Sequence, residues 1–216
     1  MSVEMYDEHE QSQRVQHWLR ENGLSLIMGV ALALAAIFGW RQYLEYQSGQ
    51  AHLASDYYTA VQLELEEDRL EDAIAQHQVM RESVPSHSYT VLAGMLIAAR
   101  QVEDGALQPA IDQYRDLLAN QELESLEPIA RLRLAQLLAA TDQASEGIAV
   151  LVGDAPFGFE ALWLETRGDL LLDQGQLQPA EQAYQQALDQ LRGEGGNIRI
   201  LETKLNAVRS SETEVS

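Results

Sequence analysis

The apolar residues of this chain first gather in one continuous run. From Leu24 to Trp40 the sequence reads LSLIMGVALALAAIFGW, without a charged side chain. Counted from Gly23, the run has 18 residues, which span about 27 Å in an α-helix and so cross most of a bilayer's hydrocarbon core. We therefore predict a transmembrane helix over residues 23–44.

Aromatic side chains flank this run. Trp18 precedes it, whereas Trp40, Tyr43 and Tyr46 lie at its end or beyond it. Trp18 and Trp40 are about 33 Å apart in a helix, so their rings would lie at opposite membrane interfaces, where Trp and Tyr are enriched. This spacing supports a membrane span over a buried core helix.

A cleaved signal peptide is the alternative, because Ala33-Leu34-Ala35 resembles a small-residue cleavage site. The segment before the run argues against it, since signal peptides begin short and basic whereas this segment is long and acidic. Two arginines precede the helix and only Arg41 follows closely, which favours an N-terminus on the cytoplasmic side. Residues 1–22 are therefore predicted to form a cytoplasmic tail.

Small residues recur every four positions along the predicted membrane helix. They are Gly29 and Ala33, and, on a second row, Ala31, Ala35 and Gly39. Such spacing lets another transmembrane helix approach closely. Alanine and glycine are also common in membrane helices in general, so helix packing and simple composition both remain open.

Beyond the membrane run the apolar pattern repeats. The segment LQPAIDQYRDLL (107–118) returns as LQPAEQAYQQAL (177–188), an offset of 70 residues or two units of 35. That period is typical of tetratricopeptide-type helical hairpins. In the last unit the expected small, turn and aromatic positions are filled by Gly168, Gly175, Ala180, Tyr184 and Ala187.

The repeat register predicts how many hairpins the chain forms. Equivalent small positions fall at Val61, Ala98, Ala135 and Gly168, with spacings of 37, 37 and 33 residues. One hairpin cannot bury its apolar face, so neighbours must stack. We predict an all-α protein: an N-terminal transmembrane helix, then a tetratricopeptide-like α-solenoid of about four hairpins over residues 51–192, and a C-terminal capping helix over 198–208. The repeat domain covers 45–209, and 210–216 form a disordered tail.

Charge and composition narrow the function. The chain has 34 acidic and 14 basic side chains, a net charge of −20, and no cysteine. A surface with this much negative charge repels the phosphate backbone of nucleic acids, which argues against nucleic-acid binding. The five histidines lack metal-ligand spacing, and nucleotide-binding and hydrolase motifs are missing. We therefore predict no metal, no cofactor, no small-molecule substrate and no catalytic residue, and a protein that is not an enzyme.

The repeat register also predicts a protein-binding groove. The first helices of stacked hairpins line the concave face. The positions that face inward lie three and six residues before each small position. Asp169, directly after the small position Gly168, is added to them. This surface is mostly apolar with an acidic end and no basic residue, which suits an extended or helical hydrophobic segment. Several of these side chains are alternatively buried between helices. The groove candidates are Tyr58, Leu92, Met95, Ile129, Leu132, Leu162, Glu165 and Asp169.

Short motifs in a fixed order carry a family resemblance. They are Glu21-Asn22-Gly23, Gly29-Val30, Gly39-Trp40-Arg41, Leu132-Arg133-Leu134-Ala135, Arg167-Gly168-Asp169 and Lys204-Leu205-Asn206. With this order of motifs the chain resembles the YfgM family, the ancillary subunits of the bacterial Sec translocon. The resemblance covers nearly the whole chain.

The resemblance implies a location and a set of partners. It places the protein in the bacterial inner membrane, single-pass, with the N-terminus cytoplasmic and the repeat domain periplasmic. The implied partners are the SecYEG translocon, a PpiD-like membrane chaperone and exported unfolded proteins, which the repeat domain would link to periplasmic chaperones. The alternatives are a structural scaffold or assembly factor of a cell-envelope complex, and a negative regulator of an envelope stress phosphorelay.

Overall fold

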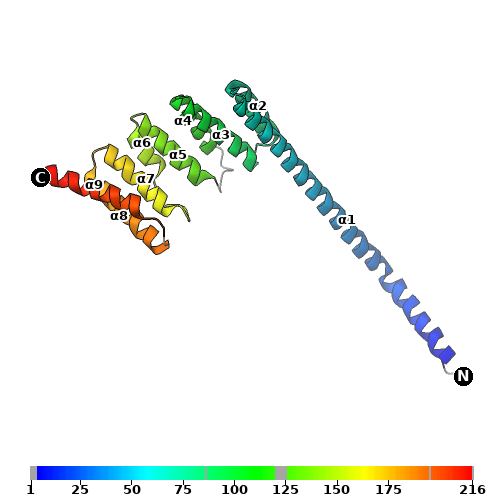
Figure 1. Cartoon of the computed structure of the whole chain (residues 1–216). Coiled ribbons are helices and arrows are strands. Elements are labelled where there is room, and N and C mark those ends of the chain that lie inside the picture. The colour runs from blue at the N-terminus through cyan, green and yellow to red at the C-terminus, as the bar shows by residue number, and fades with distance from the viewer. Residues whose placement is uncertain (1–3, 86, 120–125, 195, 216) are drawn as a thin grey trace. The chain divides into compact units, whose positions relative to one another are not determined.

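A computed structural model describes residues 4–85, 87–119, 126–194 and 196–215. In this part of the chain all regular structure is α-helical (Figure 1). The chain divides into two compact units, Met1–His52 and Leu53–Ser216. Residues 1–3 of the predicted cytoplasmic tail and residue 216 of the predicted C-terminal tail lie outside the described residues.

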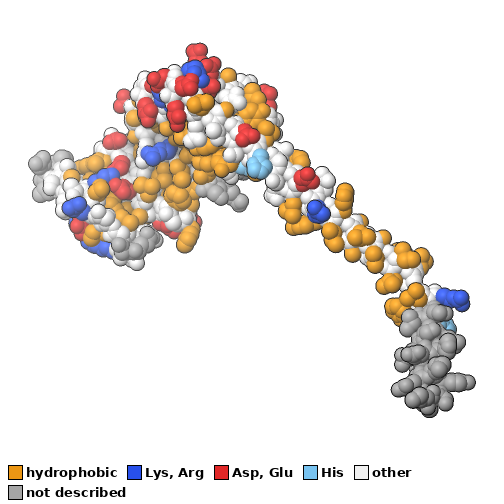
Figure 2. Space-filling view, turned by 45° about the vertical axis from the view of Figure 1, so that its right-hand side comes forward, with side chains coloured by type: hydrophobic (Ala, Val, Ile, Leu, Met, Phe, Trp, Pro, Cys, Tyr) orange, Lys and Arg blue, Asp and Glu red, His pale blue; other side chains and the backbone are white. Residues whose placement is uncertain are grey.

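The first unit is formed by one long helix, α1 (Glu4–Glu66), which continues into the second unit. The apolar run lies in α1, and none of it is buried against protein. Figure 2 shows hydrophobic side chains along the length of this exposed stretch. The helix is long and apolar enough to cross a membrane, and a bilayer would cover the apolar surface that the protein leaves open.

Helix α1 continues well beyond residue 44, where the predicted membrane segment ends. Between residues 41 and 66 there is no proline, and Gly49 is the only glycine. A single glycine costs an α-helix about 1 kcal/mol and does not stop it. The C-terminal part of α1 therefore serves as the first helix of the first repeat.

The described residues of the second unit form four stacked hairpins and a cap. Each hairpin has a first and a second helix, and the hairpins are numbered 1 to 4 in the order in which they occur along the chain. In hairpin 1, residues 53–66 of α1 share a core cluster with α2 (Leu70–Ser83). The other pairs are α3 (Ser88–Glu103) with α4 (Leu107–Ala119), α5 (Glu127–Ala140) with α6 (Ala144–Val150), and α7 (Glu160–Asp173) with α8 (Leu177–Glu194). The cap, α9 (Arg199–Val215), packs on α8 and extends beyond the predicted end at residue 208. The predicted fold class is confirmed.

The turns inside the four hairpins confirm the repeat register. Each contains one residue with positive φ: Asp68 (60°), Gly105 (75°), Asp142 (60°) and Gly175 (71°). These residues lie seven positions after the four small positions, with the same spacings of 37, 37 and 33. Glycine adopts this conformation freely, and aspartate tolerates it better than most residues. The turns of hairpins 1 and 3 therefore form without the glycine that marks the other two.

The predicted small positions lie where helices cross. Val61, Ala98 and Ala135 are fully buried. At Gly168 an added Cβ would lie 2.6 Å from the Tyr184 ring, closer than real carbon contacts. The chain can therefore close hairpin 4 only because this position has no side chain.

Candidate protein-binding surfaces

The predicted groove residues lie on the first helices of the four hairpins. Tyr58, Leu92, Met95 and Ile129 are partly buried, on α1, α3 and α5. Leu162, near the start of α7, is 46 % exposed. These side chains leave apolar surface available, although Tyr58 and Met95 also pack against core clusters.

Leu132 does not belong to this surface. It is only 3 % exposed and packs in the core with Leu151 and Trp163. The Trp163 indole nitrogen donates a hydrogen bond to the Leu151 carbonyl at 3.1 Å, which fixes the ring beneath α5. Because Trp163 of hairpin 4 covers Leu132, this residue cannot contact a partner in the groove.

The N-terminal end of the surface is aromatic. The rings of Tyr58 and Tyr89 stack with centroids 5.1 Å apart and an interplanar angle of 27°. The His87 ring stacks on the Tyr89 ring with centroids 5.3 Å apart. Its Nδ1 accepts a hydrogen bond from the Tyr89 backbone amide at 3.2 Å. The sequence pattern does not indicate this stack, because its residues come from α1, from the N-cap of α3 and from the first turn of α3.

The other end was expected to be acidic and free of basic residues, and this expectation is wrong. Lys204, on the capping helix, places its Nζ 2.7 Å from Glu165 Oε1. The same Nζ donates to Asp169 Oδ1 and Oδ2 at 2.7 and 2.8 Å. The two carboxylates are therefore neutralised in part by the only lysine of the chain. Lys204 lies 35 residues from Asp169, and the sequence pattern does not indicate that α9 folds back onto α7.

Tyr184 completes this polar cluster. Its hydroxyl donates to Asp169 Oδ1 at 2.7 Å, and the Lys204 Nζ lies 5.8 Å from its ring centroid. Burial raises the pKa of Tyr184, and the hydrogen bond to Asp169 raises it further. Burial opposes the charge on Lys204, but its bonds to Asp169 and Glu165 outweigh this and raise its pKa. The C-terminal end of the surface is thus a closed ion cluster.

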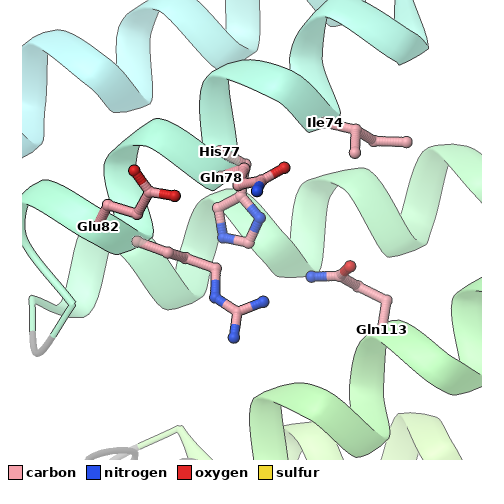
Figure 3. Close-up of a pocket in the computed structure, with 6 residues that line it drawn as sticks. Ile74, His77, Gln78, Glu82 and Gln113 are labelled. Carbon is pink, nitrogen blue, oxygen red and sulfur yellow. The ribbon is translucent and has the colours of Figure 1, made fainter.

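A pocket of about 470 Å³ opens between the second helices of hairpins 1 and 2. Figure 3 shows the amide of Gln113, on α4, directed toward the imidazole of His77, on α2. The side chains that line the pocket are Ile74, His77, Gln78, Arg81, Glu82 and Gln113. The pattern of one repeat does not indicate this pocket, because its walls belong to two different repeats.

Two features build the floor of this pocket. His77 is buried, and its Nε2 lies 2.9 Å from the Thr90 carbonyl oxygen, to which it donates as the neutral tautomer. Gly94 on α3 leaves space for the side chains of Gln113 and His77, because a Cβ at this position would lie 2.9 Å from Gln113 Nε2 and 3.0 Å from His77 Cε1. Burial lowers the pKa of His77, and the charge of Arg81 lowers it further against the opposing effects of Thr90 and Asp116.

The small residues predicted for membrane-helix packing all lie exposed on α1. They are Gly29, Ala31, Ala33, Ala35 and Gly39. A Cβ at either glycine would meet no described atom within 4 Å. The surface is open to a second helix, and packing there remains a prediction. Among the described residues no group of three His, Cys, Asp or Glu side chains could hold a metal ion.

Comparisons with known proteins agree with this architecture. The family model of the tetratricopeptide repeat-like domain matches residues 16–210. An ancillary SecYEG translocon subunit of Escherichia coli (strain K12) is 29 % identical over 184 residues, which cover 85 % of this chain and 88 % of that protein. A protein of the same description from Haemophilus influenzae is 23 % identical and covers 93 % of this chain and 97 % of its own length.

A solved structure shows the same fold. The tetratricopeptide-like repeats of a putative kinesin light chain from Podosopora anserina superpose with a TM-score of 0.54 at 11 % identity. The match covers 74 % of this chain and 87 % of that one. At this identity the likeness concerns the arrangement of the helices alone.

Proposed function

The chain belongs to the tetratricopeptide repeat-like family and its relatives are ancillary SecYEG translocon subunits, so we propose that it is a membrane-anchored, non-enzymatic subunit of the Sec translocon. Its repeat unit binds proteins. In the full proposal the N-terminus is cytoplasmic, the repeat unit is periplasmic, and the bound proteins are exported chains and a PpiD-like membrane chaperone.

The observation that carries this proposal is the extent of the match. The family model begins at residue 16, before the apolar run, and ends at residue 210, within α9. Anchor, repeats and cap are therefore matched together. A repeat domain alone would support only a protein-binding role, whereas an anchored one with translocon subunits as relatives supports a role at the membrane.

The exposed parts of the groove suit unfolded segments. Leu162 and Leu92 offer apolar surface on two different first helices, and the aromatic stack of Tyr58 and Tyr89 offers a flat one. An extended or helical hydrophobic segment lies well on such a surface. Exported chains expose such segments before they fold.

The charge of the repeat unit favours basic or neutral partners. Residues 53–216 contain 28 acidic and 11 basic side chains, so this unit carries −17 of the total −20. Most of its basic residues are already paired, for example Arg81 with Asp116 and Arg209 with Glu181. The remaining carboxylates attract basic segments and repel acidic ones, and salt weakens both effects.

Co-purification tests the proposal. The full chain, extracted from its own cells in a mild detergent, is expected to bring down the SecYEG channel. Crosslinks formed from the groove during export are expected to reach many nascent proteins, and Leu162→Glu is expected to reduce them several-fold. The control is Val152→Glu, which adds the same charge at a residue 69 % exposed in the loop before α7. Absence of the channel from the purified material would refute the proposal.

A structural scaffold of an envelope complex is the second candidate. Its favouring observation is the closed ion cluster at Lys204, which shortens the groove that clients could use. A scaffold would give one partner in fixed ratio and no crosslinks to nascent chains. The same crosslinking experiment therefore separates the two.

A further inference from the structure

The pocket between α2 and α4 lies on helices that do not carry the groove residues. Its volume of about 470 Å³ is within the range of about 300–1,000 Å³ found for ligand sites. Ile74 contributes an aliphatic wall and is 40 % exposed. Both sides of the pocket are helical, so its shape is set by the stacking of hairpins 1 and 2.

The pocket holds hydrogen-bonding groups of both kinds. Arg81 donates from Nη1 and Nη2 to the carboxylate of Asp116 at 2.5 and 3.4 Å, which joins α2 to α4. Both side chains remain partly exposed, so the guanidinium has further N–H donors and the carboxylate further acceptor sites. Gln78 adds an exposed amide at the rim.

Gln113 provides a second, independent observation. Its Nε2 is buried and has no hydrogen-bond partner among the described residues. Leaving a buried donor unpaired costs about 1–3 kcal/mol, so such groups call for a physical explanation. Rotation of the side chain's last bond would exchange the positions of Nε2 and Oε1, and from its new position the nitrogen could donate to a ligand's oxygen.

The charges of the pocket select against ions. An anion would meet the carboxylate of Glu82 on the pocket wall and that of Asp116, which lies beside Arg81, and a cation would meet the guanidinium of Arg81. A peptide group has no net charge and offers one N–H donor and one carbonyl acceptor. It can therefore bond to both members of the Arg81–Asp116 pair without an electrostatic cost.

We propose that this pocket binds a neutral peptide segment of a protein partner. A main-chain amide of the segment lies against Arg81 and Asp116, its carbonyl accepts from the turned Gln113 amide, and an aliphatic side chain covers Ile74. This second site rests on the proposed protein-binding role but not on the groove, so the repeat unit can hold two segments at once.

A small peptide mimic tests the site in the full chain, held in detergent micelles. The nine isoleucines can be labelled selectively at their δ-methyl groups, and Ile74→Val identifies the signal of Ile74. N-acetyl-leucine-N-methylamide is the probe, at millimolar concentration, and inorganic phosphate is the charged comparison. We expect the peptide mimic, but not phosphate, to shift the Ile74 methyl signal saturably while the buried Ile97 and Ile111 signals stay in place.

The variant Gln113→Leu is expected to make the chain more stable and to make its binding of the peptide mimic weaker. Removal of the unpartnered donor is expected to raise the melting temperature of the chain. Loss of one hydrogen bond to the peptide mimic is expected to lower the affinity of the chain for the mimic by about threefold to tenfold. Gln178→Leu, on the exposed face of α8, is the control and is expected to change neither quantity. No saturable shift, an equal shift with phosphate, or unchanged affinity in Gln113→Leu would overturn the site. Co-purification of SecYEG with Gln113→Leu is expected to equal that of the unchanged chain, so the two proposals fail separately.

Discussion

At the scale of single residues, the tightest constraint in the fold is the contact between Gly168 and the Tyr184 ring. The ring is almost fully buried, and its hydroxyl is held by Asp169. The ring therefore cannot move away to admit a methyl group at position 168. The repeat pattern identified both residues, and the structure explains why they depend on each other.

Gly168→Ala is expected to destabilise the chain by about 1–3 kcal/mol, because the new Cβ forces α7 and α8 apart. Gly193→Ala is the control, since a Cβ there meets nothing within 4 Å and alanine favours a helix. Thermal unfolding of both variants, followed by circular dichroism, checks the prediction. Equal melting temperatures would contradict it.

The burial of His77 is expected to make the stability of the folded chain depend on pH. Burial lowers the pKa of His77 in the folded chain below its ordinary value of 6.5. Below that pH the unfolded chain binds a proton that the folded chain resists, so stability is lost as pH falls through about 6.5 and is retained above it. His77→Gln keeps a donor for the Thr90 carbonyl but does not titrate.

The melting temperature of the unchanged chain is therefore expected to fall more steeply between pH 7 and pH 5 than that of His77→Gln. Other groups that titrate in this interval contribute equally to both proteins. The exposed His52 supplies the control: His52→Gln is expected to follow the unchanged chain. Parallel curves for all three proteins would show that His77 is not responsible.

At the scale of elements, the capping helix α9 is held by both apolar and charged contacts. Leu201, Leu205 and Val208 bury its apolar side, and Lys204 ties it to α7 through Glu165 and Asp169. Without the lysine, Glu165 would lose this ion pair, and Asp169 would keep the hydrogen bond from Tyr184. The cap thus depends on its three apolar residues and on ion pairs to two helices, since Arg209 with Glu181 and Glu202 with Arg192 also join it to α8.

Lys204→Met is expected to loosen α9 by about 1–2 kcal/mol, since the pair is only partly exposed and the hydrogen bonds are charge-assisted. Amide hydrogen exchange should rise along α9 while α3 and α5 stay protected. The control is Arg199→Met, which removes a charge from an exposed position of the same helix. An equal response to the two changes would show that charge alone, and not this contact, matters.

At the scale of the whole molecule, the lack of cysteine makes the orientation in the membrane directly testable. Single cysteines can be placed before the anchor, as His17→Cys, and in the repeat unit, as Gln178→Cys. A membrane-impermeant maleimide is expected to label Gln178→Cys once the outer membrane is permeabilised, and His17→Cys only after lysis. The reverse pattern would place the repeat unit in the cytoplasm.

Much of this architecture follows from sequence periodicity. The spacing of 37, 37 and 33 residues that joins Val61 to Gly168 recurs in the turns from Asp68 to Gly175. Local rules suffice here, because a helical repeat buries its apolar face against the next repeat in the chain. The apolar run is similarly local, since its length alone indicates a membrane span.

The anchor, the four hairpins, the cap and the resemblance to translocon subunits thus follow from the amino-acid sequence. Contacts between repeats were needed to show which groove residues are covered, that Lys204 neutralises Glu165 and Asp169, and that α2 and α4 enclose a pocket. The physical reason is the range of the contacts. Helix formation and hairpin closure depend on neighbours within one repeat, whereas the bonds from Arg81 to Asp116 and from Lys204 to Asp169 each join residues 35 positions apart on different elements.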